Sequence, residues 1–239
     1  MKTMHEIPRP LLTQTHLDRV RHHSSGPLHS PHFTMLDDAD LDRLAEALTR
    51  DRPRPIPVFA YGSLIWNPGF EVQARRRARA IGWHRRFSIH LDHFRGSPDQ
   101  PGLMLALASG GECDGLLLDI APGTEGESLC ALLRRELVAH ELAANAVWIE
   151  VATEQGREQA LTFYADPVGT ELADLSVDEQ ASRLARANGA AGSGAEYLHR
   201  TAHGLRDAGI FDPYIWELDR LVAAEIDRLH DEPKTASPD

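Results

Sequence analysis

The first regular pattern of apolar residues in the chain begins near Leu36. Apolar side chains recur there every three or four residues, at Leu36, Leu41, Leu44, Ala45 and Leu48. This spacing places them on one side of a helix, and Asp37 or Asp38 can accept hydrogen bonds from its first N–H groups. We therefore predict a helix over residues 36–48, followed by a proline-broken linker over residues 52–57.

Short apolar runs fill the middle of the chain, and longer helical patterns fill its end. Strands are predicted at residues 58–61, 87–91, 102–107, 114–120, 147–151 and 161–164. Helices are predicted at about residues 128–145, 177–188, 196–208 and 213–229. Strands that come early and helices that come late are typical of an α+β fold. We expect one domain over residues 35–230, a small mixed β-barrel or sheet with flanking helices.

The first 34 residues carry few large apolar side chains. They hold four prolines and six of the 13 histidines, namely His5, His16, His22, His23, His29 and His32. Such a segment buries too little surface to offset the entropy of ordering it. We predict a mobile N-terminal arm over residues 1–34, whose removal changes stability and activity little, and a C-terminal tail over residues 231–239. The histidines could hold a metal ion, but a solvated arm without ligand geometry is favoured, so no metal is expected.

Charge and cysteine usage narrow the classes of function. A net charge of -11 argues against a general nucleic-acid binder and gives no sign of membrane affinity. No apolar run approaches the roughly 20 residues of a membrane span, and the first ten residues lack the apolar region of a secretory signal. Two cysteines, Cys113 and Cys130, are too few for a disulfide scaffold or a cysteine-built zinc site. They fit a reducing compartment, so a cytoplasmic protein is expected.

One candidate site lies where a short apolar run leads into Tyr61-Gly62-Ser63-Leu64. Gly62 can adopt a positive φ and lets a ligand approach the backbone. Successive N–H groups in such a turn can bind a carboxylate or an oxyanion. A tight turn after a strand, with Trp66 as a packing residue, explains the same pattern. The glycine spacing matches neither a Walker A loop nor a dinucleotide-binding loop.

A second candidate is Glu136, in the helix predicted over residues 128–145. The apolar face of that helix is formed by Leu129, Leu132, Leu133, Leu137 and Ala144. Glu136 falls on this face, and a carboxylate there is costly unless it is paired or functional. Desolvation would raise its pKa, as a general base near neutral pH needs. The alternative is a buried salt bridge to an arginine elsewhere, because Arg134 and Arg135 are expected to point away; His140 is expected on the same face.

A third candidate is the basic run over residues 75–79, followed by His84-Arg85-Arg86. Trp83 and Phe87 could act as stacking platforms in a nucleic-acid interface. The run leads into an alternating segment, however, whose residues face opposite sides of a strand. Ion pairs on a solvated strand face are therefore the favoured interpretation.

Other mechanisms find little support in the sequence. It has no Gly-x-Ser-x-Gly turn and no His-Glu-x-x-His helix, and no motif marks Cys113 or Cys130 as a nucleophile. A carboxylate and a set of backbone N–H groups remain. That pair suits a reaction in which the substrate carries its own nucleophile.

Several blocks of sequence, in order, resemble the ChaC-type γ-glutamylcyclotransferases over about residues 54–228. They are VFAYGSLIWNPGF (58–70), GWHRRF (82–87), FRGSPDQPGL (94–103), RREL (134–137), ALTFYADP (160–167), EYL (196–198) and GIFDPY (209–214). The resemblance implies a small β-barrel with flanking helices, and an intracellular enzyme without metal or cofactor. It also implies that a loop of Tyr61, Gly62, Ser63 and Leu64 holds the γ-glutamyl group, that Glu136 is the acid/base, and that Tyr197 lines the substrate site.

The expected function is the cleavage of glutathione to 5-oxoproline and Cys-Gly by attack of the γ-glutamyl α-amine on its own γ-carbonyl. Ring closure is intramolecular, so holding the substrate folded supplies much of the rate. Two alternatives stay open. One is a cyclotransferase for other γ-glutamyl amines or peptides, and the other is a non-catalytic small-molecule or RNA-binding module on the same fold. The only partner expected is the small-molecule substrate.

Overall fold

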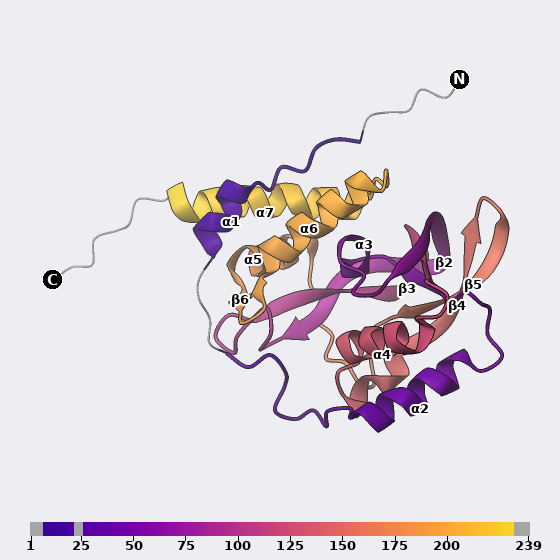
Figure 1. The fold of residues 1–239 in the computed structure, drawn as a ribbon. Helices are drawn as coiled ribbons and strands as arrows, with labels where there is room; N and C mark the ends of the chain where they lie inside the picture. The colour runs from indigo at the N-terminus through magenta and orange to yellow at the C-terminus, as the bar shows by residue number, and fades with distance from the viewer. Residues whose placement is uncertain (1–6, 22–25, 232–239) are drawn as a thin grey trace, which may run out of the picture. The chain divides into compact units, whose positions relative to one another are not determined.

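The computed structural model describes residues 7–21 and 26–231 (Figure 1). Its contacts divide the chain into two compact units. Unit 1 comprises residues 1–29, 90–104 and 174–239, and unit 2 comprises residues 30–89 and 105–173. The candidate turn and Glu136 both belong to unit 2, whereas Tyr197 belongs to unit 1.

Five strands close into a barrel, which confirms the expected α+β class. They are β1 (Pro57–Ala60), β2 (Val72–Leu91), β3 (Gly102–Ile120), β4 (Ala146–Thr153) and β5 (Gly156–Phe163). Their order is β1-β3-β2-β4-β5, and the barrel closes where Val58 of β1 lies parallel to Leu161 of β5. The runs 102–107 and 114–120, predicted as two strands, form the single strand β3. Gly110 and Gly111, with φ values of 95° and 73°, lie within this strand between the two predicted runs.

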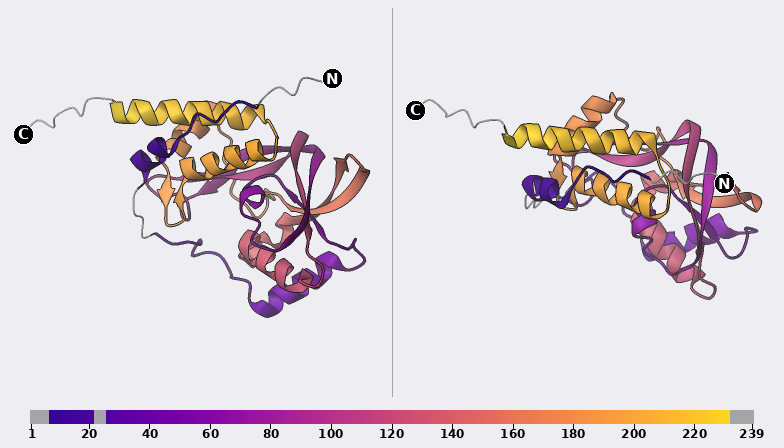
Figure 2. Two further views of the ribbon diagram at one scale, coloured as in Figure 1. Left: turned by 45° about the horizontal axis from the view of Figure 1, so that its top comes forward. Right: turned by 90° about the horizontal axis from the view of Figure 1, so that it is seen from above.

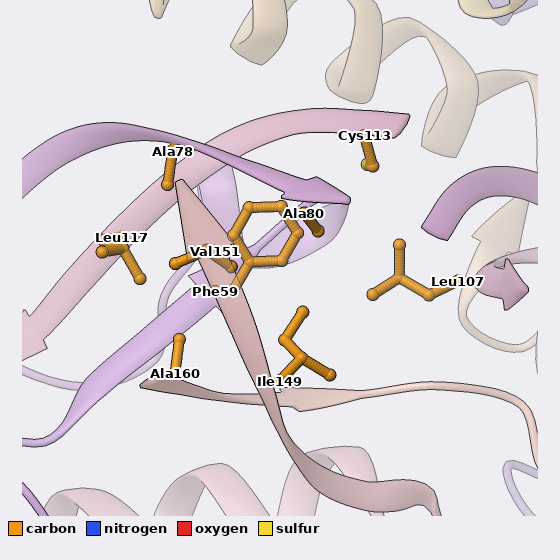
Figure 3. Packing of buried hydrophobic residues seen from close by; sticks show 9 residues of the cluster. All are labelled: Phe59, Ala78, Ala80, Leu107, Cys113, Leu117, Ile149, Val151 and Ala160. Carbon is orange, nitrogen blue, oxygen red and sulfur yellow. The ribbon is translucent and has the colours of Figure 1, made fainter. Parts of the chain in front are cut away.

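The barrel interior is filled by a cluster of apolar side chains from all five strands (Figure 3). On β2 the small residues Ala78 and Ala80 face inward and alternate with exposed arginines such as Arg79. On β3, Gly115 gives room for β1, because a Cβ there would lie 2.8 Å from the Phe59 ring. The neighbouring β1 is buried along its whole length, so the candidate turn starts from a rigid strand.

Helices α2 (Asp38–Thr49) and α4 (Glu125–Glu136) lie side by side in unit 2 (Figures 1 and 2). Asp37 caps α2 as predicted, accepting a hydrogen bond of 2.8 Å from the N–H of Asp40. The helix predicted over residues 128–145 is wrong in its second half: α4 ends at Glu136, and a short 3₁₀ helix, η1 (His140–Asn145), follows. Between them the backbone pairs with residues 34–36, where the Leu36 N–H donates to the carbonyl of Val138 at 3.2 Å. Tertiary pairing thus ends the helix before the apolar pattern does.

Unit 1 contains the helices α1 (Gln14–Val20), α5 (Val177–Arg186), α6 (Gly194–Asp207) and α7 (Pro213–Asp231), with two short strands, β6 (Asn188–Gly189) and β7 (Gly192–Ser193). The three helices predicted after residue 176 are confirmed. Ser176 and Ser193 cap α5 and α6, each accepting a hydrogen bond from the N–H three residues later. Helix α7 packs along α5 and α6 (Figure 2).

The structure differs from the expected mobile arm in residues 7–21. Leu12, Leu17 and Val20 are buried. The N–H of Leu12 donates to the Asp219 carboxylate on α7 at 3.2 Å, and its carbonyl contacts the His199 ring at 2.8 Å. Because α1 has only seven residues, its pattern is too short to stand out in the sequence. His5, His22 and His23 lie outside the described residues, as do residues 232–239 of the predicted tail.

Two adjacent leucines test how this segment contributes to stability. Leu12 is 1% exposed and Leu11 is 56% exposed. We expect Leu12→Ala to lower the free energy of unfolding by about 2–3 kcal/mol, because it leaves a cavity in unit 1. Leu11→Ala should change it by less than about 0.5 kcal/mol. Urea unfolding of the two variants measures this difference, and equal values would support the mobile arm instead.

No helix among residues 7–21 and 26–231 combines the length and apolar composition that crossing a membrane requires.

Candidate functional site

The turn that follows β1 presents backbone donors. Gly62 has φ -137° and ψ -124°, so the expected positive φ is not used there. The short helix α3 (Ser63–Trp66) begins directly after it. The first hydrogen bonds of this turn run from the Ile65 N–H to the Gly62 carbonyl at 3.0 Å and from the Asn67 N–H to the Ser63 carbonyl at 2.8 Å. The N–H groups of Ser63 and Leu64 come before the first donor of the helix and have no carbonyl within it to bind.

The side chains of the turn anchor it to unit 2. Leu64 and Ile65 are buried, so Leu64 has only its backbone to offer a ligand. Tyr61 packs against the barrel cluster. The turn is therefore held by its apolar side chains while its backbone carries the polar groups.

Glu136 is the last residue of α4, and its side chain is 21% exposed. Burial raises the pKa of its carboxyl group, and the positive charge of Arg135 opposes this rise. A carboxyl group in this setting holds its proton to a higher pH than an ordinary glutamate. That property suits a group that takes up and returns a proton near neutral pH.

Arg135 links Glu136 to the turn, contrary to the expectation that it points away. Its Nε lies 3.1 Å from Glu136 Oε1, and its Nη2 donates to Ser63 Oγ at 2.7 Å. Its Nη1 donates to the carbonyl of Asn67. Adjacent residues diverge only while a helix continues, and α4 ends here. Two of the predicted site residues, Ser63 and Glu136, thus bind one guanidinium.

His140 does not join this group. It is exposed in η1 and lies 3.0 Å from the carboxylate of Asp40. The break in the predicted helix after Glu136 explains the difference, since His140 no longer lies one turn along the same face.

Tyr197 is buried on α6 in unit 1. The guanidinium carbon of Arg95 lies 5.5 Å from the centre of its ring. Arg95 also donates to the Ser193 carbonyl at 3.1 Å, and burial lowers its pKa. The role of Tyr197 at the substrate site stays a prediction.

Part of the basic run forms ion pairs on the barrel surface, as the favoured interpretation predicted. Arg76 contacts Asp119 at 3.1 Å and Glu158 at 2.6 Å. Arg79 contacts Asp114 at 2.6 Å and Glu112 at 3.0 Å.

Arg85 behaves differently from its neighbours. It is buried, with 3% of its surface exposed, and its Nε donates to the carbonyl of Tyr61 at 3.0 Å. Sequence reasoning grouped Arg85 with the surface arginines. Its spacing of two residues from the buried Phe87 was a signal that could have separated it, whereas the alternation from Ala78 and Ala80 would have placed it on the opposite face.

No three His, Cys, Asp or Glu side chains within the described part of the chain are gathered as a metal site requires. A groove between α2 and the start of α4 is lined in part by Asp42, Glu46, Glu125 and Cys130. None of the predicted site residues lines this groove.

Comparisons with known proteins agree with the motifs. The family model described as ChaC-like protein matches residues 56–225. A glutathione-specific γ-glutamylcyclotransferase from Escherichia coli K12 is 33% identical over 165 residues, covering 66% of this chain and 71% of that protein. Glutathione-specific γ-glutamylcyclotransferase 1 from Danio rerio is 32% identical over 176 residues, covering 71% of this chain and 89% of that protein.

A solved structure agrees with the barrel. The crystal structure of a yeast γ-glutamylcyclotransferase specific to glutathione matches with a TM-score of 0.62 at 21% identity, covering 71% of this chain and 96% of that chain. A likeness at this identity supports the fold. The match of the family model to most of the chain, together with relatives identical at a third of their aligned positions, shows that the chain belongs to the ChaC-like family.

Proposed function

We propose that this protein cleaves glutathione by intramolecular cyclisation, giving 5-oxoproline and Cys-Gly. The observation that carries the proposal is the single guanidinium of Arg135, which holds both the Glu136 carboxylate and the Ser63 hydroxyl of the turn. The names of the relatives, which are γ-glutamylcyclotransferases specific to glutathione, support this substrate.

Glu136 acts as the acid/base. Its carboxylate removes a proton from the α-ammonium of the γ-glutamyl group, and the free amine attacks the γ-carbonyl carbon of the same group. As the tetrahedral intermediate collapses, the amide bond to cysteine breaks and Glu136 returns the proton to the leaving amine. The ring nitrogen gives up its second proton, so that the products are the neutral lactam of 5-oxoproline and Cys-Gly with a protonated amino group. No water and no second substrate enter the step. A raised pKa suits this double use, because the same group must both accept and donate the proton.

The turn binds the γ-glutamyl group through its backbone. N–H groups at Gly62, Ser63 and Leu64 face a carboxylate or the developing oxyanion without a side chain that must reorganise. Holding the substrate folded brings amine and carbonyl together, and effective molarities of such reactions reach roughly 10⁵ M or more. We also place the enzyme in the cytoplasm, since Cys113 and Cys130 are both free, as a reducing compartment allows.

The direct test is to incubate the purified protein with glutathione and to follow 5-oxoproline and Cys-Gly by mass spectrometry. Equal amounts of the two products are expected. γ-Glutamyl dipeptides without the glycine serve as the comparison for the alternative substrate class. Turnover of those dipeptides with none of glutathione would replace the proposed substrate, and binding without turnover of either would favour a non-catalytic module.

Activity should fall on the acid side as Glu136 takes up its proton. Because burial raises this pKa, the fall should begin well above the value of about 4.3 of an ordinary glutamate. Initial rates at saturating glutathione, measured from about pH 4.5 to about pH 9, report the pKa in the enzyme–substrate complex. A rate that stays flat down to the range of an ordinary glutamate would contradict the assigned environment.

A further inference from the structure

Arg85 is a buried cation beneath the candidate turn. It projects from β2, and 3% of its surface is exposed. Its Nε donates to the Tyr61 carbonyl at 3.0 Å, and its Nη2 donates to the Asp114 carbonyl. One planar guanidinium therefore bridges the end of β1 and the middle of β3.

These two carbonyls lie where the β1–β3 pairing stops. The last paired residues of this ladder are Ala60 and Leu116. Tyr61 directly follows the end of β1, and Asp114 comes two residues before Leu116 on β3. Arg85 thus supplies donors at the point where β1 leaves the barrel and the turn begins. A forked guanidinium can serve two carbonyls at once, which a single ammonium group cannot do with the same geometry.

The bond to Tyr61 also sets the direction of a group in the proposed substrate site. The carbonyl of Tyr61 and the N–H of Gly62 belong to one peptide unit, and this unit is trans. In a trans peptide the two groups point in opposite directions. Since the carbonyl points toward Arg85, the Gly62 N–H points away from Arg85.

We infer that Arg85 is a positioning residue, which fixes the Gly62 N–H in the direction that binds the γ-glutamyl group. The identity of the bound group in this inference rests on the proposed function. The effect of Arg85 on the geometry of the turn does not. Without Arg85 the peptide plane between Tyr61 and Gly62 is free to rotate. The Gly62 N–H then no longer points in a fixed direction before the substrate binds. The binding of the ground state and of the transition state then both weaken.

Two variants test the role, with Arg86→Met as the matched control. Arg86 follows on the same strand and is partly exposed, so its replacement removes the same charge without the bonds to Tyr61 and Asp114. Arg85→Met removes every donor, and Arg85→Lys keeps the charge but only one point of donation. We expect kcat/KM for glutathione to fall about 100-fold in Arg85→Met and about tenfold in Arg85→Lys, the effect of one or two bonds from a charged donor. Arg86→Met should stay within about twofold of the wild type.

Amide hydrogen exchange gives a measurement that does not depend on the substrate. The N–H groups of Ile65 and Asn67 are protected by the hydrogen bonds of the turn. They should exchange faster in both Arg85 variants, whereas amides of the neighbouring helix α4 should be unchanged. If Arg85→Met does not fold, Arg85→Lys carries the test. A folded Arg85→Lys protein with wild-type kcat/KM and wild-type exchange in the turn would overturn the inference.

A separate outcome would count against the proposed function alone. If the wild-type protein does not cleave glutathione while exchange in the turn still responds to Arg85→Lys, the positioning of the peptide stands and the substrate assignment fails.

Discussion

Glu136→Gln should lose at least about 100-fold in kcat for glutathione while remaining folded. Glutamine keeps the shape of the side chain and can still accept a hydrogen bond from Arg135, which lies 3.1 Å from the carboxylate. It cannot take a proton from the substrate amine or return one to the leaving amine. The loss should therefore appear in kcat more than in KM, because the turn that we propose to hold the γ-glutamyl group is untouched.

The stability of this variant separates catalysis from a structural ion pair. Burial raises the pKa of Glu136, which means that the folded protein disfavours the charged form. A neutral glutamine relieves that cost, so the melting temperature should stay the same or rise. Residues that serve catalysis often lower the stability of the fold, and replacing them then raises it.

Glu127→Gln is the matched control, because Glu127 lies on the same helix and is exposed. It should change neither kcat nor the melting temperature. A folded Glu136→Gln protein with near-normal turnover would remove Glu136 from the mechanism. A variant that unfolds would instead support the ion pair with Arg135 as the reason for the buried carboxylate.

Much of the fold could be predicted because its elements are long and strongly patterned. The helices after residue 176 carry several apolar residues at helical spacing, and local turn residues mark their ends. The barrel strands were predicted less completely, because only residues 87–91 of β2 (Val72–Leu91) were expected as a strand. The helix predicted over residues 128–145 shows the limit. Its apolar period continues past Glu136, but the chain there pairs with residues 34–36, a contact that no local pattern records.

The sequence singled out Glu136 and the turn at Gly62 as candidates, and both stay predictions, but it did not single out the two arginines that contact them. Glu136 stood out because a carboxylate interrupts an apolar face, and the turn stood out because a buried strand runs into Gly62. Arg135 and Arg85 did not stand out, because each looks like one of several adjacent arginines. Arg135 differs from its neighbours because α4 ends beside it, and Arg85 differs because it is buried against the carbonyl of Tyr61. Both features depend on tertiary contacts. The spacing of apolar residues, every two residues in a strand or every 3.6 in a helix, does not specify such contacts.

Gly62→Val should reduce kcat/KM far more than Ser63→Ala. Valine places a β-branched side chain where, in our proposal, the substrate approaches the backbone. We therefore expect a loss of about 100-fold or more and weaker binding of 5-oxoproline by titration. Gly126→Val is the control, since a Cβ at that glycine meets no atom within 4 Å. Ser63→Ala keeps every backbone N–H and removes only the bond of 2.7 Å from Arg135. Its loss should be about tenfold at most.

The reverse ranking would change the chemistry. If Ser63→Ala were inactive and Gly62→Val were tolerated, Ser63 would be a nucleophile, and an acyl adduct on Ser63 should be trapped by mass spectrometry. The geometry favours the ranking in which Gly62→Val loses more activity than Ser63→Ala. The bond from Arg135 makes Ser63 Oγ an acceptor toward a permanent cation, and a guanidinium cannot take the hydroxyl proton. A serine nucleophile needs a base in that place. In this turn the hydroxyl instead shares its guanidinium with Glu136, which leaves the substrate's own amine as the nucleophile.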